Sequence, residues 1–124
     1  MAAIRRVTEI PGPKSRAMLE RRANAVVRGL GKSTDVVVER AEGALVHDAD
    51  GNTLIDLAGG IGMSAIGHCP PAVVSAIASQ AAQLIHTCAL VTTYEPYVKL
   101  CEVLNEIAPG TSPKKSSPAG SGIT

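Results

Sequence analysis

The sequence predicts an α+β fold in which an N-terminal helix precedes a three-stranded antiparallel meander and two further helices. Apolar residues recur at helical spacing near the N-terminus and again after residue 70, a period that indicates amphipathic helices. Between these segments, Asp50-Gly51 separates two apolar runs, which is the strongest short-range signal of a β-hairpin. The core must be largely aliphatic, because the 124 residues include no Phe, no Trp and 2 Tyr.

The first helix is expected over residues 15–29, after an irregular lead-in at residues 1–13 that ends in Pro-Gly-Pro. Gly29 and Gly31 supply a C-terminal stop. The apolar face contains Met18, Leu19, Ala23, Val26, Val27 and Leu30. The other face is rich in arginine and could bind an anion, but a solvated helix surface is the commoner meaning of such charge.

The meander is expected over residues 36–57, beginning with the β-branched run Val36-Val37-Val38. Glu42-Gly43 marks its first turn, and residues 49–52 form the hairpin turn. We interpret His47 as a strand residue facing solvent, since one His without a nearby second ligand makes no metal site.

Residues 56–71 join the meander to the next helix and contain four glycines within nine positions. Glycine lets backbone pass close to another group and permits positive φ. The interleaved aliphatic residues favour a buried turn over a flexible linker. The turn is either a tight crossing between packed elements, the commoner case, or the wall of a binding pocket. It matches neither the dinucleotide fingerprint nor the phosphate P-loop.

The last two helices are expected near residues 70–86 and 94–108. Pro70 and Pro71 suit a first helical turn, and Thr92 with Glu95 matches a capping box. The first of these helices has a wide apolar stripe of Val73, Val74, Ile77, Ala78, Ala81, Leu84 and Ile85. The expected buried stripe of the second is Tyr97, Val98, Cys101, Leu104 and Ala108. Residues 109–124 are too polar to offset ordering entropy, so we expect a disordered tail.

Composition excludes several classes of function. With 12 Lys and Arg against 11 Asp and Glu, the net charge of +1 gives no reason to expect nucleic acid or an anionic membrane as partner. The apolar runs are too short to span a bilayer, and no secretory signal opens the chain. Cys69, Cys88 and Cys101 form no C-x-x-C pair, so no metal site or disulfide framework is expected, and a reducing cytoplasm fits.

Several short motifs follow one another in a characteristic order. They are Arg21-Arg22, Asp56-Leu57-Ala58-Gly59-Gly60-Ile61, Gly67-His68, His86-Thr87-Cys88, Tyr94-Glu95-Pro96-Tyr97 and Leu100-Cys101-Glu102. Over roughly residues 14 to 116, the chain resembles the N-terminal portion of class III pyridoxal-phosphate aminotransferases, most closely the branch that acts on 4-aminobutyrate. Each motif is weak by itself, whereas their order and spacing together are specific.

The resemblance implies a fold-type I enzyme that works as a dimer or as a tetramer of dimers. Such enzymes move an amino group from an amine such as 4-aminobutyrate to 2-oxoglutarate, with pyridoxal phosphate held on a lysine. Residues 14–69 would belong to the small domain, and residues 70–108 would lead into the large domain. Gly60 and Ile61 would lie at the substrate pocket.

The chain also departs from the family pattern. After Lys115-Ser116 the family has an apolar strand ending in Ser-Gly-x-Glu-Ala, which cradles the cofactor phosphate; here Pro118 and Gly120 argue against a central strand. Ser121 and Gly122 fall at the right spacing but no Glu follows, so they are at most vestigial. The cofactor lysine lies beyond this point in the family, so we expect no catalytic residue and no productive cofactor binding here.

Three functional hypotheses follow. The first is a truncated aminotransferase chain that is inactive alone. The second is a non-catalytic interaction protein that associates with itself, with a full-length homologous subunit or with another partner through exposed dimer-type surfaces. The third, an independent small enzyme, has least support, since the sequence suggests no catalytic triad, metal cluster or carboxylate pair.

Overall fold

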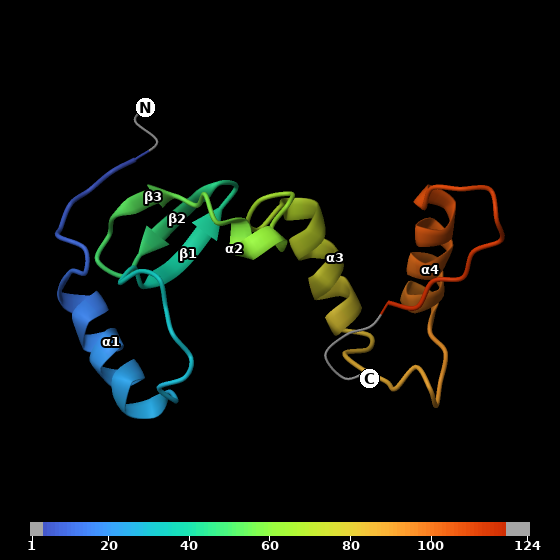
Figure 1. Ribbon diagram of the computed structural model, residues 1–124, viewed down its shortest axis with the longest axis horizontal. Helices are drawn as coiled ribbons and strands as arrows, with labels where there is room; N and C mark the ends of the chain where they lie inside the picture. Colours follow the sequence, from blue (N-terminus) through green and yellow to red (C-terminus); the bar gives the residue numbers. More distant parts are fainter. Residues whose placement is uncertain (1–3, 119–124) are drawn as a thin grey trace. The chain divides into compact units, whose positions relative to one another are not determined.

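The computed structural model describes residues 4–118 (Figure 1). The chain divides into two compact units, residues 1–79 and 80–124. Ser121 and Gly122 lie outside the described residues, as does the end of the expected disordered tail. Their roles, and the assignment of residues 14–69 and 70–108 to small-domain and large-domain segments, stay predictions.

The described elements confirm the predicted α+β class and its order. They are α1 (Pro13–Ala25), β1 (Val38–Glu42), β2 (Leu45–Asp48), β3 (Thr53–Ile55), α2 (Gly59–Gly62), α3 (Pro71–Ala81) and α4 (Glu95–Ile107). Figure 1 shows the three strands side by side as one sheet, with β2 in the middle. The short helix α2 lies inside the glycine-rich segment that follows β3, and it was not predicted.

The sheet is an antiparallel meander whose register is set by two turns. Leu45 lies opposite Ile55 across β2 and β3, so the hairpin around Asp50-Gly51 is confirmed. The first strand begins at Val38, later than the expected Val36, and its pairing with β2 is irregular between Val38 and Arg40. The valine run therefore leads into the strand and does not form its centre.

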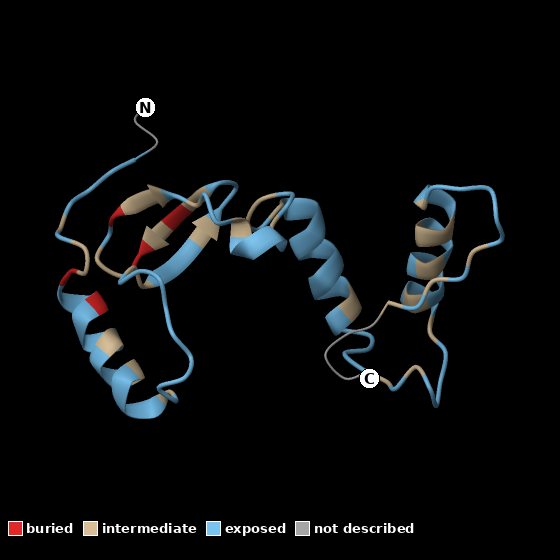
Figure 2. Cartoon of the chain, in the orientation of Figure 1, coloured by how far each residue is buried: buried red, intermediate tan, exposed pale blue. Residues whose placement is uncertain are grey.

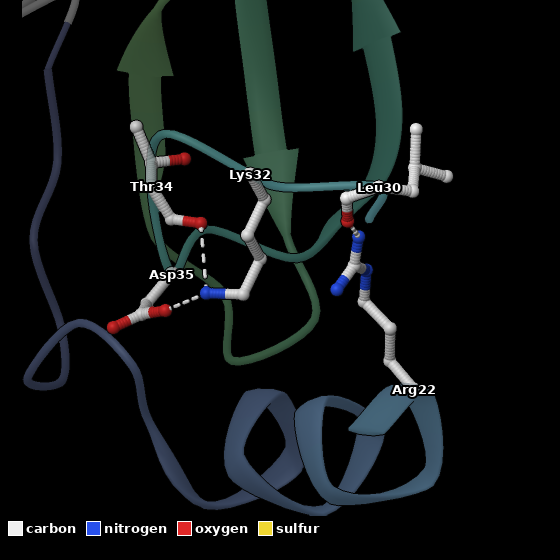
Figure 3. Close-up of polar contacts among 5 residues, drawn as sticks. All are labelled: Arg22, Leu30, Lys32, Thr34 and Asp35. Carbon is white, nitrogen blue, oxygen red and sulfur yellow. Dashed lines mark hydrogen bonds and ion pairs between the residues drawn. The ribbon is translucent and has the colours of Figure 1, made fainter. Parts of the chain in front are cut away.

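Helix α1 ends at Ala25, before the predicted glycine stop, because Val26 already has an extended backbone. The following loop folds back on the helix, where Arg22 Nη2 donates a hydrogen bond to the Leu30 carbonyl at 2.6 Å (Figure 3). In the same loop Lys32 contacts Asp35 and the Thr34 carbonyl. The Arg22 side chain therefore holds this loop against the helix.

Asp50, at the hairpin turn, accepts hydrogen bonds from the first amides of α1. The amide of Lys14 donates to Oδ1 at 2.8 Å, and the amide of Ser15 donates to Oδ2 at 2.9 Å. A carboxylate here satisfies donors that lack an intrahelical partner and opposes the positive end of the helix dipole. The turn residue therefore anchors α1 to the sheet.

Few apolar side chains are buried in this structure (Figure 2). Val46 is the one buried hydrophobic residue among those described, whereas Ser15, Asp48 and Asn52 are buried polar residues. The predicted buried stripe of α4 is wrong for this chain, since the helix contains no buried residue. The apolar stripe of α3 is not buried either. The reason is that, in the described part, extensive packing between elements is confined to the strands.

Helix α4 begins without the predicted capping box. Its N-cap is Tyr94, which makes no side-chain cap hydrogen bond, and the Thr92 hydroxyl bonds that of Thr87. Helix α3 ends at Ala81, earlier than the expected residue 86. None of the helices in the described range is long and apolar enough to cross a membrane.

Candidate functional site

The candidate site is the glycine turn, residues 56–68, which follows β3. Asp56 starts it: one carboxylate oxygen, Oδ1, accepts hydrogen bonds from the amides of Ala58 at 2.9 Å and Gly59 at 3.0 Å. The backbone then makes the single turn of α2, within which Gly60 and Ile61 have φ values of 61° and 55°. Positive φ is ordinary for glycine but uncommon for isoleucine.

His68 closes the turn. Its backbone exchanges two hydrogen bonds with Gly43, at 2.8 Å and 2.9 Å. Its ring Nε2 lies 2.7 Å from Asp56 Oδ2, and both side chains are largely shielded, with 25% of His68 and 15% of Asp56 exposed. Both ends of the turn are therefore joined to each other and to the β1–β2 connection.

The hydrogen bond from His68 holds the pKa of Asp56 below its ordinary value, and the Gly59 amide acts in the same direction. Desolvation opposes this effect and is outweighed. Asp56 is thus held as a carboxylate that accepts three hydrogen bonds. A charged acceptor makes each of these bonds stronger than a neutral one would.

A hollow of about 210 Å³ lies against the inner side of this turn. It is lined by Gly43, Ala44, Asp56, Gly59, Ser64, Ala65, Gly67 and His68. Although Ser64, His68 and Asp56 share it, the hydrogen bonds of the described residues include none between the Ser64 side chain and His68. Among the described residues, His68 therefore makes its side-chain hydrogen bond to Asp56 and not to the Ser64 hydroxyl.

The two predicted pocket residues, Gly60 and Ile61, do lie on this turn, but they face outward and not into the hollow's lining. Ile61 is 93% exposed, and Leu57, Met63 and Ile66 are exposed as well. The prediction of a buried turn is wrong for this chain, because the other described elements of the unit formed by residues 1–79 leave these side chains exposed. The sequence reasoning noted His68 but missed its pairing with Asp56, for which the only signal was an acid and a histidine flanking the glycines.

The residues around the hollow do not fit pyridoxal phosphate. No lysine lines it to hold the cofactor covalently, and the Asp56 carboxylate would repel a phosphate group. Two lysines elsewhere are already engaged, Lys32 with Asp35 and Lys114 with the Gly110 carbonyl. The described residues also contain no group of three side chains placed to bind a metal ion.

Comparison with known proteins identifies the family. The family description Aminotransferase class-III matches residues 28–123. The chain belongs to the class III aminotransferases. It is 53% identical over 112 residues to the 4-aminobutyrate aminotransferase of Mycobacterium tuberculosis, covering 90% of this chain and 25% of that protein. It is 43% identical over 100 residues to the 5-aminovalerate aminotransferase of Pseudomonas putida, covering 81% and 24%.

Solved aminotransferase structures share this fold. Ornithine aminotransferase from Toxoplasma gondii matches with a TM-score of 0.68 and 25% identity, covering 75% of this chain and 21% of that one. N-acetylornithine aminotransferase from Stenotrophomonas maltophilia matches with a TM-score of 0.59 and 34% identity, covering 71% and 22%. The chain thus spans about a quarter of the length of its curated relatives.

Proposed function

We propose that this chain carries the substrate-facing glycine turn of a 4-aminobutyrate aminotransferase-like protein and does not catalyse amino transfer by itself. The observation that carries the proposal is the 53% identity to a 4-aminobutyrate aminotransferase over nearly the whole chain. The parent reaction is transfer of an amino group from 4-aminobutyrate to 2-oxoglutarate, with pyridoxal phosphate supplying the electron sink.

The substrate class is an ω-amino carboxylate. Relatives at 53% and 43% identity are named for 4-aminobutyrate and 5-aminovalerate, which differ by one methylene. One methylene in an apolar pocket changes binding by only about 1–3 kcal/mol, so close relatives can divide between such substrates. The higher identity favours 4-aminobutyrate.

Inactivity of the chain alone is supported by the composition of the hollow, which offers no lysine. The test is to mix the purified chain with pyridoxal phosphate and record visible absorbance, then add 4-aminobutyrate and 2-oxoglutarate and measure glutamate. We expect no saturable absorbance band and no glutamate. The Mycobacterium tuberculosis relative, treated identically, is the positive control. Glutamate formation above the protein-free blank would overturn the proposal.

A second candidate function, association with another polypeptide, is favoured by the exposed aliphatic side chains of α3, among them Val73, Val74 and Ile77. Exposed apolar surface of this kind marks interaction sites or a tendency to aggregate. The partner would be a second copy or a full-length homologous subunit. Sedimentation of the chain with and without the Mycobacterium tuberculosis relative distinguishes these two partners.

A cytoplasmic location belongs to the same proposal. Cys69, Cys88 and Cys101 are all free thiols, and two of them are exposed, which suits a reducing compartment. Cell fractionation with an antibody against the chain tests this, and recovery in a membrane or secreted fraction would contradict it.

A further inference from the structure

The sheet has β2 in the middle, so β1 and β3 are its outer strands. The free edge of an outer strand presents backbone amides and carbonyls that can pair with another chain. Natural sheets prevent such pairing with charged residues, with irregular pairing or with a segment that covers the edge. The outer strands of this sheet differ in which of these protections they have.

Strand β1 is protected by its own residues. Its sequence is Val-Glu-Arg-Ala-Glu, and its pairing with β2 is irregular between Val38 and Arg40. If β1 paired antiparallel with β1 of another copy about Arg40, arginine would lie opposite arginine, and like charges directly opposite each other destabilise a sheet. Charge and irregular pairing therefore disfavour strand addition at this edge.

Strand β3 has neither protection. Its sequence is Thr-Leu-Ile, without a charged residue, and it pairs with β2 without a register shift. The Asp56 amide donates to the Ala44 carbonyl at 2.9 Å, so the backbone of Asp56 faces β2. Successive residues of an antiparallel strand bond on opposite sides. The backbone groups of Thr53 and Ile55 therefore face the outer edge of the sheet.

The outer edge of β3 is covered by the N-terminal segment, residues 4–8. The Arg5 amide donates to the Thr53 carbonyl at 2.9 Å, and the Thr53 amide donates to the Arg5 carbonyl at 2.7 Å. The segment is also held by Asn52, whose side-chain oxygen accepts the amides of Val7 and Thr8. The outward backbone groups of Thr53 are thus already occupied within the chain.

We propose that residues 4–8 block strand addition at β3, and that their release lets β3 pair antiparallel with β3 of a second copy of this chain. Pairing about Ile55, which is 40% exposed, places Thr53 opposite Leu57 of the second copy and opposes no like charges. The same surface of both copies forms this contact, as a twofold dimer requires. The contact does not involve α3, and it does not depend on the proposed function.

The experiment measures amide hydrogen exchange in the full 124-residue chain with the substitution Arg5→Pro. Proline has no amide hydrogen, so the variant cannot donate to the Thr53 carbonyl. In dilute solution we expect the Thr53 amide to exchange about tenfold faster than in the unmodified chain. As concentration rises, exchange of the Thr53 and Ile55 amides should slow by about tenfold, because pairing of two copies protects both. In the unmodified chain, exchange at Ile55 should not depend on concentration.

The matched control is Arg5→Ala, which removes the same side chain but keeps the backbone amide. It should behave as the unmodified chain does. Association through α3 would leave the outward amide of Ile55 unprotected, so exchange at Ile55 distinguishes the two contacts. Exchange at Ile55 that is independent of concentration in Arg5→Pro, or equal protection in Arg5→Ala, would overturn the proposal.

The Asp48 amide, which donates to the Asn52 carbonyl at 3.0 Å, reports whether the sheet stays folded. If Arg5→Pro abolishes its protection, the unmodified chain decides. A synthetic peptide of residues 53–57 should slow exchange at Ile55 and accelerate exchange at Arg5, whereas a peptide of the charged residues 38–42 should do neither. No effect of the first peptide, or equal effects of both, would overturn the proposal. None of these measurements uses cofactor or turnover, so their failure is distinct from failure of the aminotransferase assignment.

Discussion

The Asp48 carboxylate accepts two hydrogen bonds from Asn52 across the hairpin turn. The Asn52 side-chain amide donates to Oδ2 of Asp48 at 2.6 Å, and its backbone amide donates to Oδ1 at 2.7 Å. Both residues are almost completely buried. The side-chain oxygen of Asn52 then accepts the amides of Val7 at 2.7 Å and Thr8 at 3.0 Å. A polar turn, and not an apolar cluster, is thus the point where the N-terminal segment meets the sheet.

Replacing Asn52 by Ala should destabilise the first unit. The change leaves the amides of Val7 and Thr8 and one oxygen of Asp48 without their partner, and an unsatisfied buried polar group costs about 1–3 kcal/mol. Urea unfolding followed by circular dichroism should show a lower free energy of unfolding by about that amount. Asn24→Ala, on the exposed surface of α1, is the control and should change it by less than about 0.5 kcal/mol. Equal effects of the two variants would contradict the network.

Replacing Gly12 by Ala should detach Asp50 from α1. A Cβ on Gly12 would lie 2.4 Å from Cγ of Asp50, a distance that forces the carboxylate away from the amides of Lys14 and Ser15. We expect weaker far-ultraviolet helical signal and faster exchange of those two amides. Gly29→Ala is the matched control, since nothing lies within 4 Å of its added Cβ. Unchanged exchange in Gly12→Ala would show that the helix does not depend on Asp50.

The interaction of Asp50 with α1 should weaken in acid. Desolvation raises the pKa of Asp50, but hydrogen bonds from Ser15 and Lys14 and the charge of Lys14 outweigh it and leave the pKa below 3.8. Since the folded-state pKa is the lower one, the stabilisation is complete above the ordinary value and is lost as pH falls through the depressed pKa. Chemical shifts of the Lys14 and Ser15 amides should therefore titrate below pH 3.8. The variant Asp50→Asn should abolish this titration of the two amide shifts. The control Asp35→Asn, in an exposed loop, should leave it unchanged. A titration midpoint above pH 3.8 would contradict the assignment to Asp50.

The exposed face of α3 should drive self-association. Val74 and Ile77 are 48% and 63% exposed, and burying one such side chain is worth about 1.5–3 kcal/mol. We expect the unmodified chain to form oligomers in light scattering, and Val74→Asp with Ile77→Asp to return it toward monomer. Ser75→Asp adds charge to the same helix without removing apolar surface and is the control. A monodisperse monomer with a sharp cooperative melt would refute this prediction.

The features that the sequence predicted correctly are those decided by neighbouring residues. Asp50-Gly51 fixes a tight turn, and Pro71 begins α3, because both effects act within a few positions. The prediction of a capping box at Thr92 was wrong although the residue types matched the pattern, because the N-cap residue of α4 is Tyr94. A local sequence pattern shows which residues could cap a helix, but the backbone conformation of the folded chain determines which residue occupies the N-cap position.

The relationships that sequence reasoning missed join distant residues. Asp56 and His68 are twelve positions apart, and Asp50 reaches α1 from 35 and 36 positions away. Nothing in the residue types near Lys14 reveals that its amide has a partner in a later turn. Burial of the glycine turn and of the α4 stripe was also misjudged, since an apolar pattern indicates a face suited to burial and cannot show whether another element covers it.

The hydrogen bonds around Asn52 combine one contact between close neighbours in the sequence with contacts to a distant segment. Val7 and Thr8 precede Asn52, their hydrogen-bond acceptor, by more than forty residues, so this contact closes a long loop of the chain. The turn itself closes over only four residues, between Asp48 and Asn52, at little entropic cost. The hairpin turn can therefore close without the N-terminal segment, whereas docking of Val7 and Thr8 requires that Asn52 is already in place.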